Sequence, residues 1–280
     1  MGYSLRTKII NSIEIYRQMK NNAEELIYSV NNGIATITIN RPARKNALST
    51  DVVKALAEAW EKIDNDEQVK VAILTSTDCG VFSAGMDLKE AAEIKKTTGV
   101  DVLSTLQDPF HQRMRRCQKP IIAAMTGHLI AGGMLLSLNS DLRVGLVGTR
   151  VGISESKIGR GSPWAVPLLG MLPQPLIMEL VLTGELFPIE RFYDLGFINY
   201  LEETPEKVRQ QAYRLANIIR DNAPLSVVAA KASILKAMSL GCEDGFEEAK
   251  RLHEIVYASD DGIEGPKAFS EKRKPVWVGK

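Results

Sequence analysis

KPIIAAMTGHLIAGGMLLSLNSDLRVG, residues 119–145, combines two kinds of segment within one short stretch. Residues 120–127 are almost wholly apolar, which is typical of a β-strand buried on both faces. A turn of small residues leads from there into an uncharged helix that begins near Gly132 and Gly133. Residues 141–146 then predict another strand. This order of strand, turn, helix and strand predicts a layered α/β sheet with right-handed crossovers.

The segments upstream extend the same pattern. Residues 25–39 alternate around the turn NNG and predict a β-hairpin. Ser49 is a suitable N-cap for a helix that runs to about residue 63. Residues 69–76 predict another strand buried on both faces, and a helix is expected to follow from Asp87.

The chain changes character after about residue 204. Residues 205–280 predict three helices and a basic tail, whereas residues 1–24 predict an N-terminal extension that we interpret as a surface helix. Residues 25–204 are therefore expected to form one α/β core between these two regions.

Composition excludes several classes of function. The 280 residues include 35 basic and 34 acidic side chains, so no global field collects nucleic acid or a membrane surface. No apolar run approaches the ~20 residues of a membrane span. The three cysteines are far apart, which favours a reducing, cytoplasmic location. No zinc spacing, P-loop or dinucleotide fingerprint is present, so we expect neither a metal nor a cofactor.

Two glycine-containing turns each join a strand to a helix. They are FSAGMDLKE (residues 82–90) and TGHLIAGGM (residues 126–134). The first N–H groups of a helix have no intrahelical partner, and glycine lets another group approach them closely. Two such turns that face each other would form a two-donor oxyanion hole suited to an enolate. The alternative is that these glycines only permit tight packing.

Five ordered blocks from about residue 25 to the C-terminus resemble the crotonase (enoyl-CoA hydratase/isomerase) superfamily. They are INRPARKNALS (39–49), FSAGMDLKE (82–90), the opening stretch (119–145), LTGELFPIERFYDLGFINYL (182–201) and AFSEKRKPVW (268–277). The resemblance implies a crotonase-like layered (ββα) spiral core with a C-terminal helical oligomerisation region. It also implies a homotrimer or a dimer of trimers.

The resemblance further implies that the substrate is an acyl-CoA thioester. Its thioester oxygen would lie between the N–H groups of Met86 and Gly132. The CoA would lie over the NRPARKNAL turn, which includes Ala47, with Arg44 and Lys45 near its phosphates. The remaining residues implied to contact CoA are Ala84, Asp87 and Leu88, with Phe269 and Lys272 reaching the CoA of a neighbouring subunit.

The sequence departs from the hydratase pattern at one of two glutamate positions. Hydratases of this superfamily carry a glutamate three residues after the oxyanion glycine, where this chain has Leu135. The second glutamate is retained as Glu155, with Ser154 before it instead of the usual proline. We expect Leu135 and Trp164 to form an apolar wall that raises the pKa of Glu155. The absent carboxylate argues against simple hydration, because addition of water uses two acid–base groups.

Other side chains are weaker candidates for catalysis. His128, Arg160 and Ser162 could supply an extra acid or base, although His128 is better explained as a packing residue. His111 and His253 are expected on helices without metal-like partners.

We favour isomerisation of an enoyl-CoA double bond by Glu155 as the single acid–base group. The alternatives are an enoyl-CoA hydratase with a substitute second group, a hydrolase of C–C bonds that needs no CoA, and a non-catalytic acyl-CoA-binding protein. Lyase, decarboxylase and synthase branches of the superfamily also lack the first glutamate.

Overall fold

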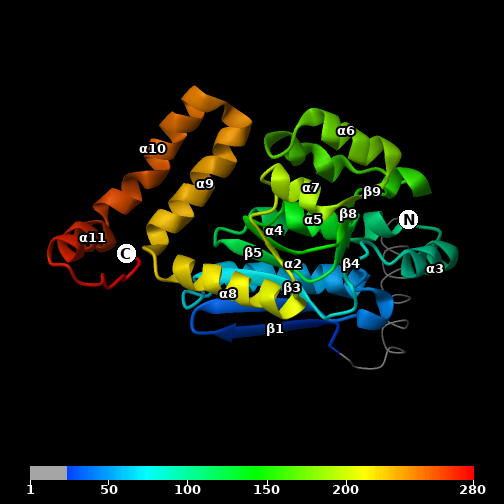
Figure 1. The fold of residues 1–280 in the computed structure, drawn as a ribbon, viewed down its shortest axis with the longest axis horizontal. Coiled ribbons are helices and arrows are strands. Elements are labelled where there is room, and N and C mark those ends of the chain that lie inside the picture. Colours follow the sequence, from blue (N-terminus) through cyan, green and yellow to red (C-terminus); the bar gives the residue numbers. More distant parts are fainter. Residues whose placement is uncertain (1–23) are drawn as a thin grey trace, which may run out of the picture.

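Between residues 71 and 152, successive strands alternate between two sheets (Figure 1). The computed structural model describes residues 24–280, so the surface helix predicted within residues 1–24 lies almost entirely outside the described residues. The larger sheet has the order β1 (Leu26–Asn31), β2 (Ile34–Ile39), β3 (Val71–Ser76), β5 (Ile121–Met125), β7 (Leu142–Leu146) and β10 (Tyr200–Glu202). The smaller sheet has the order β4 (Val81–Ser83), β6 (His128–Ile130), β8 (Arg150–Gly152) and β9 (Leu186–Pro188).

Each repeat of the core places one strand in each sheet and then a helix. The units β3–β4–α3 and β5–β6–α5 follow this order, and their strands pair in parallel with those of the next unit. The arrangement confirms the layered (ββα) core that the resemblance implies. The helices of this part are α2 (Thr50–Asn65), α3 (Leu88–Thr98), α4 (Gln112–Arg115), α5 (Gly132–Leu138), α6 (Gln174–Thr183), α7 (Ile189–Asp194) and α8 (Pro205–Arg220). Short 3₁₀ segments are η1 (Pro42–Arg44), η2 (Val102–Thr105), η3 (Glu155–Ile158) and η4 (Pro163–Gly170).

Strand β3 is buried on both faces, as its apolar run predicted. Ala72 and Leu74 belong to the apolar cluster that also contains side chains of α2. Val71 and Ile73 belong to a second cluster, which α8 completes. Since α8 packs on the larger sheet, it covers the core, and only the helices after it leave the core.

The hairpin and the capped helix predicted at the start of the core are also present in the structure. β1 and β2 pair antiparallel around Asn32 and Gly33, whose positive φ angles of 48° and 76° suit a tight hairpin turn. Ser49 caps α2, because its side chain accepts a hydrogen bond from Val52 N. Both elements confirm the prediction.

Several elements were not predicted, among them β4, β6, β8 and α11 (Asp260–Ser270). Strands β4, β6 and β8 have three residues each, and β6 lies where we expected only a turn. Such strands are too short to show an alternating pattern. Helix α11 contains two glycines and Pro266, yet it is helical and capped by Ser259.

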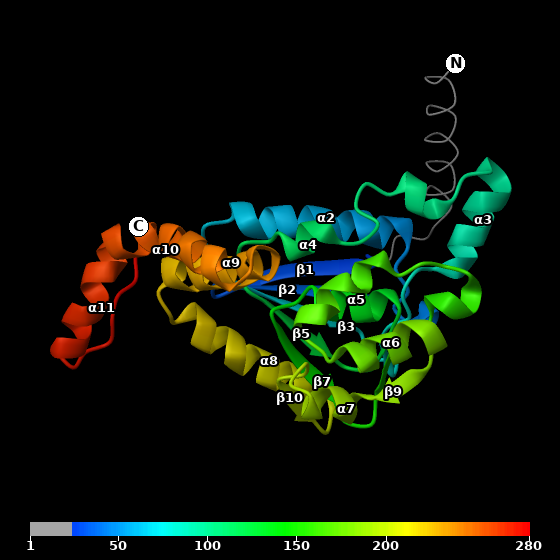
Figure 2. The same ribbon diagram turned by 90° about the horizontal axis from the view of Figure 1, so that it is seen from above.

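The last three helices form an arm that projects from the core (Figures 1 and 2). It consists of α9 (Pro224–Leu240), α10 (Cys242–Ala258) and α11 (Asp260–Ser270). Large apolar side chains are exposed along it: Ile234, Phe246, Ile255, Tyr257, Ile263 and Phe269. Within residues 24–280, no single helix has the length and apolar character to cross a membrane, although α8 and α9 pass that test jointly as a pair bent by 110°.

Candidate active site

The two glycine-containing turns lie against each other at the edge of the smaller sheet. Gly85 has a φ of +80°, and a Cβ atom placed on it would lie 2.8 Å from the Gly132 nitrogen. Leu48 holds the first turn in place, because its N–H donates to Gly85 O (2.7 Å) and its carbonyl accepts from Asp87 N (3.0 Å). This pairing skips the N–H of Met86. Within the described residues we find no acceptor for the N–H of Met86. Gly132 is the first residue of helix α5, so its N–H has no partner within that helix.

The backbone is strained at Ala131, the residue before Gly132. Ala131 has φ 51° and ψ −112°, a conformation that is costly for any residue with a Cβ atom. Its own N–H donates to Gly152 O at 2.9 Å, which ties the turn to strand β8. The strain is therefore maintained by the surrounding sheet, and it sets the direction of the next peptide N–H, that of Gly132.

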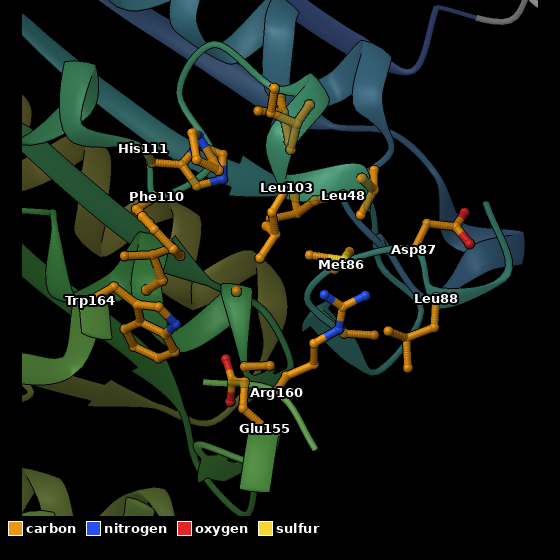
Figure 3. Close-up of a pocket in the computed structure, with 18 of the residues that line it drawn as sticks. Leu48, Met86, Asp87, Leu88, Leu103, Phe110, His111, Glu155, Arg160 and Trp164 are labelled. Carbon is orange, nitrogen blue, oxygen red and sulfur yellow. The ribbon is translucent and has the colours of Figure 1, made fainter. Parts of the chain in front are cut away.

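A cavity opens beside the two turns (Figure 3). It encloses about 900 Å³ of empty space, including its open mouth. Its lining contains eight of the residues expected to bind the substrate or to take part in the reaction: Ala84, Met86, Asp87, Leu88, Gly132, Leu135, Glu155 and Trp164. The structure thus brings together residues that are up to 80 positions apart in the chain.

Glu155 is the cavity's least satisfied carboxylate. It is the first residue of η3, and its Oε2 atom is buried without a hydrogen-bond partner among the described residues. Burial raises the pKa of Glu155 above its ordinary value, although a hydrogen bond with the Trp164 side chain acts in the opposite direction. Leu135, only 4% exposed, also lines the cavity. Leu135 and Trp164 therefore supply the apolar surroundings that we expected for Glu155.

Arg160 is the only cationic side chain among the described residues that line this cavity (Figure 3). Its Nη1 lies 2.6 Å from Asp101 Oδ2, and its backbone N–H donates to Glu155 O at 2.9 Å. Ser162 is not part of the cavity wall. His128 is also absent from it, and its Nδ1 accepts a hydrogen bond from Arg150 N, so His128 is a structural residue, as expected.

The carboxylate of Asp87 is occupied by other residues of the same chain. It caps α3 by accepting from Glu90 N, and it lies 3.0 Å from Arg41 Nη2 and 3.2 Å from Arg44 Nη2. Burial alone would raise the pKa of Asp87, but these hydrogen bonds and the two arginine charges hold it below its ordinary value. The sequence did not predict this ion-pair cluster, which makes Asp87 a positioning residue for the turn.

The NRPARKNAL turn stacks on the AGMDL loop. Lys45, with φ 53°, accepts a hydrogen bond from Ala84 N through its carbonyl, and its side chain is exposed. Ala47 is buried, and its carbonyl accepts a hydrogen bond from Arg41. Arg44 remains 43% exposed despite its contact with Asp87. Two exposed cations therefore flank the loop that carries Met86.

Phe269 and Lys272 do not reach the cavity of their own chain. Phe269 lies on α11 and is 87% exposed, and Lys272 follows that helix with a φ of 54°. Figure 1 shows α11 at the opposite end of the molecule from α3, whose residues Leu88 and Glu90 line the cavity.

The wall of the cavity opposite Glu155 was missed in the sequence. It comes from the segment between α3 and α4, which contributes Val102, Leu103, Leu106, Phe110 and His111. This segment shows no helical or alternating period, and its turn depends on the Asp108 carboxylate, which accepts from Gln112 N and Arg113 N. His111 was expected on a helix but precedes α4, with a φ of 49°.

Comparison with known proteins places this geometry in a family. A family profile described as Enoyl-CoA hydratase/isomerase matches residues 29–280. The chain is 36% identical over 247 residues to Enoyl-CoA hydratase EchA19 of Mycobacterium tuberculosis, covering 85% of this chain and 91% of that protein. It is 31% identical over 254 residues to (E)-benzylidenesuccinyl-CoA hydratase of Thauera aromatica, covering 89% and 97%.

Another relative and one solved structure agree. Carnitinyl-CoA dehydratase of Salmonella typhi is 31% identical over 267 residues, covering 92% of this chain and all of that protein. A crystal structure of enoyl-CoA hydratase from Mycobacterium tuberculosis H37Rv superimposes with a TM-score of 0.83 at 36% identity, covering 92% of this chain and 100% of that one. The chain belongs to the enoyl-CoA hydratase/isomerase family, that is, to the crotonase superfamily.

Proposed function

We propose that this protein isomerises the double bond of an enoyl-CoA thioester, with Glu155 as the single acid–base group. One observation carries the proposal. Glu155 places a buried, unpaired carboxylate oxygen in the cavity, and Leu135 occupies the position of the first hydratase glutamate. A lone carboxylate can move a proton between two carbons, whereas addition of water uses two acid–base groups.

The reaction balances without a co-reactant. The Glu155 carboxylate removes a proton from the α-carbon of a 3-enoyl thioester, and the electron pair shifts onto the thioester oxygen. The N–H groups of Met86 and Gly132 stabilise the resulting dienolate. The protonated Glu155 then returns the proton to the γ-carbon, which leaves the conjugated 2-enoyl thioester. A raised pKa suits this role, because the group must both accept and release a proton near neutral pH.

Coenzyme A is expected to lie along the exposed side of the two stacked loops. Arg44 and Lys45 are the exposed cations suited to its phosphates. Leu88, which is 48% exposed, and Ala84 both line the cavity. Phe269 would meet CoA only in an oligomer, and the exposed apolar side chains of α9–α11 favour association into a trimer or a dimer of trimers.

Hydration is the second candidate, because the named relatives are a hydratase, a further hydratase and a dehydratase. It requires another group to activate water. The carboxylates of Asp87 and Glu90 are bound internally, the first to arginines and the second to Thr50. Arg160 and Ser154 are polar residues of the cavity lining near Glu155, and of the two we consider Arg160 as a group that could orient a water molecule.

Two substrates separate these candidates. Purified protein is incubated with a 3-enoyl-CoA and, separately, with a 2-enoyl-CoA, and the products are resolved by chromatography. The proposal expects conjugation of the 3-enoyl ester at a higher kcat/KM than hydration of the 2-enoyl ester. Faster hydration, abolished in Glu155→Gln, would establish the hydratase instead. Retention of both activities in Glu155→Gln would remove Glu155 from either mechanism.

A further inference from the structure

His111 is a buried polar side chain that neither the fold nor the proton transfer uses. It is 3% exposed, and it lines the same cavity as Glu155. Among the described residues, none donates to or accepts from its ring; only its backbone is bonded, with Asn139 Nδ2 donating to the His111 carbonyl. Figure 3 shows the ring across the cavity from Glu155 and far from Asp87 and Leu88, with Phe110 and Trp164 between His111 and Glu155.

The backbone at His111 is held in an uncommon conformation. Its φ of 49° lies in the left-handed region, which glycine adopts most readily and which asparagine, aspartate and histidine adopt more often than other residues. The Asp108 carboxylate fixes the turn from the following N–H groups, those of Gln112 and Arg113. The turn is therefore held by the Asp108 carboxylate, and no hydrogen bond of the imidazole contributes to it among the described residues.

The ring is neutral at physiological pH. Burial lowers the pKa of His111 to about 4, although the Asp108 carboxylate nearby acts to raise it. A neutral imidazole offers one N–H donor and one acceptor nitrogen. It offers no positive charge, so it does not compensate the burial of a carboxylate. Its complement is a neutral oxygen group.

The surroundings make such a complement necessary. The neighbouring wall is apolar and consists of Leu103, Leu106 and Phe110. The ring nitrogens are not among the described side-chain atoms that are fully buried without a hydrogen-bond partner, so they open onto the cavity, and a ligand that fills the cavity would leave them unpartnered unless it carries a polar group. A histidine in this wall is therefore best explained by a ligand that completes its hydrogen bonds.

We infer that the acyl group bound in this cavity carries a hydroxyl or carbonyl oxygen remote from the thioester, and that His111 hydrogen-bonds to it. The inference rests on the proposed acyl-CoA function and adds to it a substrate class, oxygenated acyl thioesters. His111 then determines specificity and takes no part in the proton transfer at Glu155.

Matched pairs of enoyl-CoA esters test the inference. The two members of a pair have the same chain length, and one of them carries a keto or hydroxyl oxygen in the distal half of the acyl chain. The position of that oxygen changes from one pair to the next. The wild type is expected to favour the best oxygenated member by about tenfold in kcat/KM, the upper range for one net hydrogen bond. His111→Leu is expected to reduce that ratio to about one by losing rate only on the oxygenated member.

Two further variants provide the controls. His111→Asn tolerates the positive φ and keeps a polar head, so part of the preference is expected to remain. Phe110→Leu changes the neighbouring wall without a polar atom and is expected to keep the ratio, whatever its effect on either rate. If His111→Leu does not fold, His111→Asn together with the wild type still decides the case.

Equal turnover of both members by the wild type would overturn the inference, as would a preference that survives in His111→Leu. Failure of the proposed function looks different, because neither ester would then react. In that event, calorimetric binding of saturated acyl-CoA pairs still decides the role of His111. A tenfold tighter binding of the oxygenated member supports it, and equal binding overturns it.

Discussion

Substitution of Gly85 by alanine tests the contact between the two turns. A Cβ atom on Gly85 would lie 2.8 Å from Gly132 N and 2.9 Å from Ala131 Cβ. Contacts of this length are not tolerated, and the two neighbouring atoms belong to the first residue of α5 and to its N-cap residue, Ala131. The Gly132 N–H must therefore move if alanine is accommodated.

The expected magnitudes follow from two separate effects. A φ of +80° is strained for alanine, which costs about 1–2 kcal/mol of folding stability. Displacing Gly132 N–H adds about 1–3 kcal/mol of overpacking. Loss of one oxyanion donor lowers kcat by about 100- to 1000-fold. We therefore expect Gly85→Ala to fold with reduced stability and to be almost inactive.

Gly80→Ala is the matched control. Gly80 has nearly the same φ, +77°, but a Cβ atom placed on it would have no neighbouring atom within 4 Å among the described residues. Urea unfolding is expected to show the strain cost alone, and turnover of 3-enoyl-CoA is expected to equal that of the wild type. The reasoning would be refuted if both variants lost activity to the same extent, or if Gly85→Ala kept a wild-type kcat.

Three further predictions concern the charges of the site. Glu155→Gln is expected to lower kcat by at least about 100-fold, while adding about 0.5–2 kcal/mol to the stability measured at neutral pH. Because the pKa of Glu155 is raised in the folded state, its stabilising contribution is complete at low pH and is lost as pH rises through that pKa. Urea unfolding at several pH values should therefore show the gap between variant and wild type closing as pH falls below the ordinary glutamate pKa, and a constant gap would contradict this. For the same group, the wild-type kcat should fall as Glu155 is protonated, at a pH above the usual range for glutamate; a pH-independent rate would exclude Glu155 as the base. Asp87→Asn leaves the buried Arg41 with Glu25 as its remaining carboxylate and should lower the free energy of unfolding by about 2–3 kcal/mol. Arg44→Ala, which removes a half-exposed partner of Asp87, should lower it by about 0–1 kcal/mol. Equal losses of stability in thermal unfolding would argue against the importance of the buried Arg41–Asp87 pair.

Sequence patterns predicted the parts of the fold that depend on many residues of one kind. The run at residues 69–76 became β3, buried against α2 and α8, because no charged side chain interrupts the strand. Helix α2 followed from its cap at Ser49 and its apolar face. Strands β4 and β6 escaped notice, because the small sheet depends on pairing between segments rather than on a local pattern.

The residues of the candidate site fall into the same two groups: those that a sequence motif identifies, and those whose positions depend on contacts between distant segments. The residues within the family motifs, such as Met86 and Glu155, were identified because their spacing is specific, and the structure brings them to one cavity. The segment 101–111 was not, because its conformation depends on the Asp108 carboxylate and on the Asn139 contact that follows α5. The ion pairs of Asp87 were missed for a related reason, since Arg41 lies 46 positions away in the chain.

The central claim is that one carboxylate, Glu155, carries a proton from the α- to the γ-carbon of an enoyl thioester. Its most direct test is a single turnover of 3-enoyl-CoA in heavy water, followed by mass spectrometry of the 2-enoyl product. Transfer by one carboxylate predicts that part of the product keeps substrate hydrogen at the γ-carbon, and that Glu155→Gln forms no product on this timescale. A hydroxyacyl product, or conjugation by Glu155→Gln at the wild-type rate, would contradict the account.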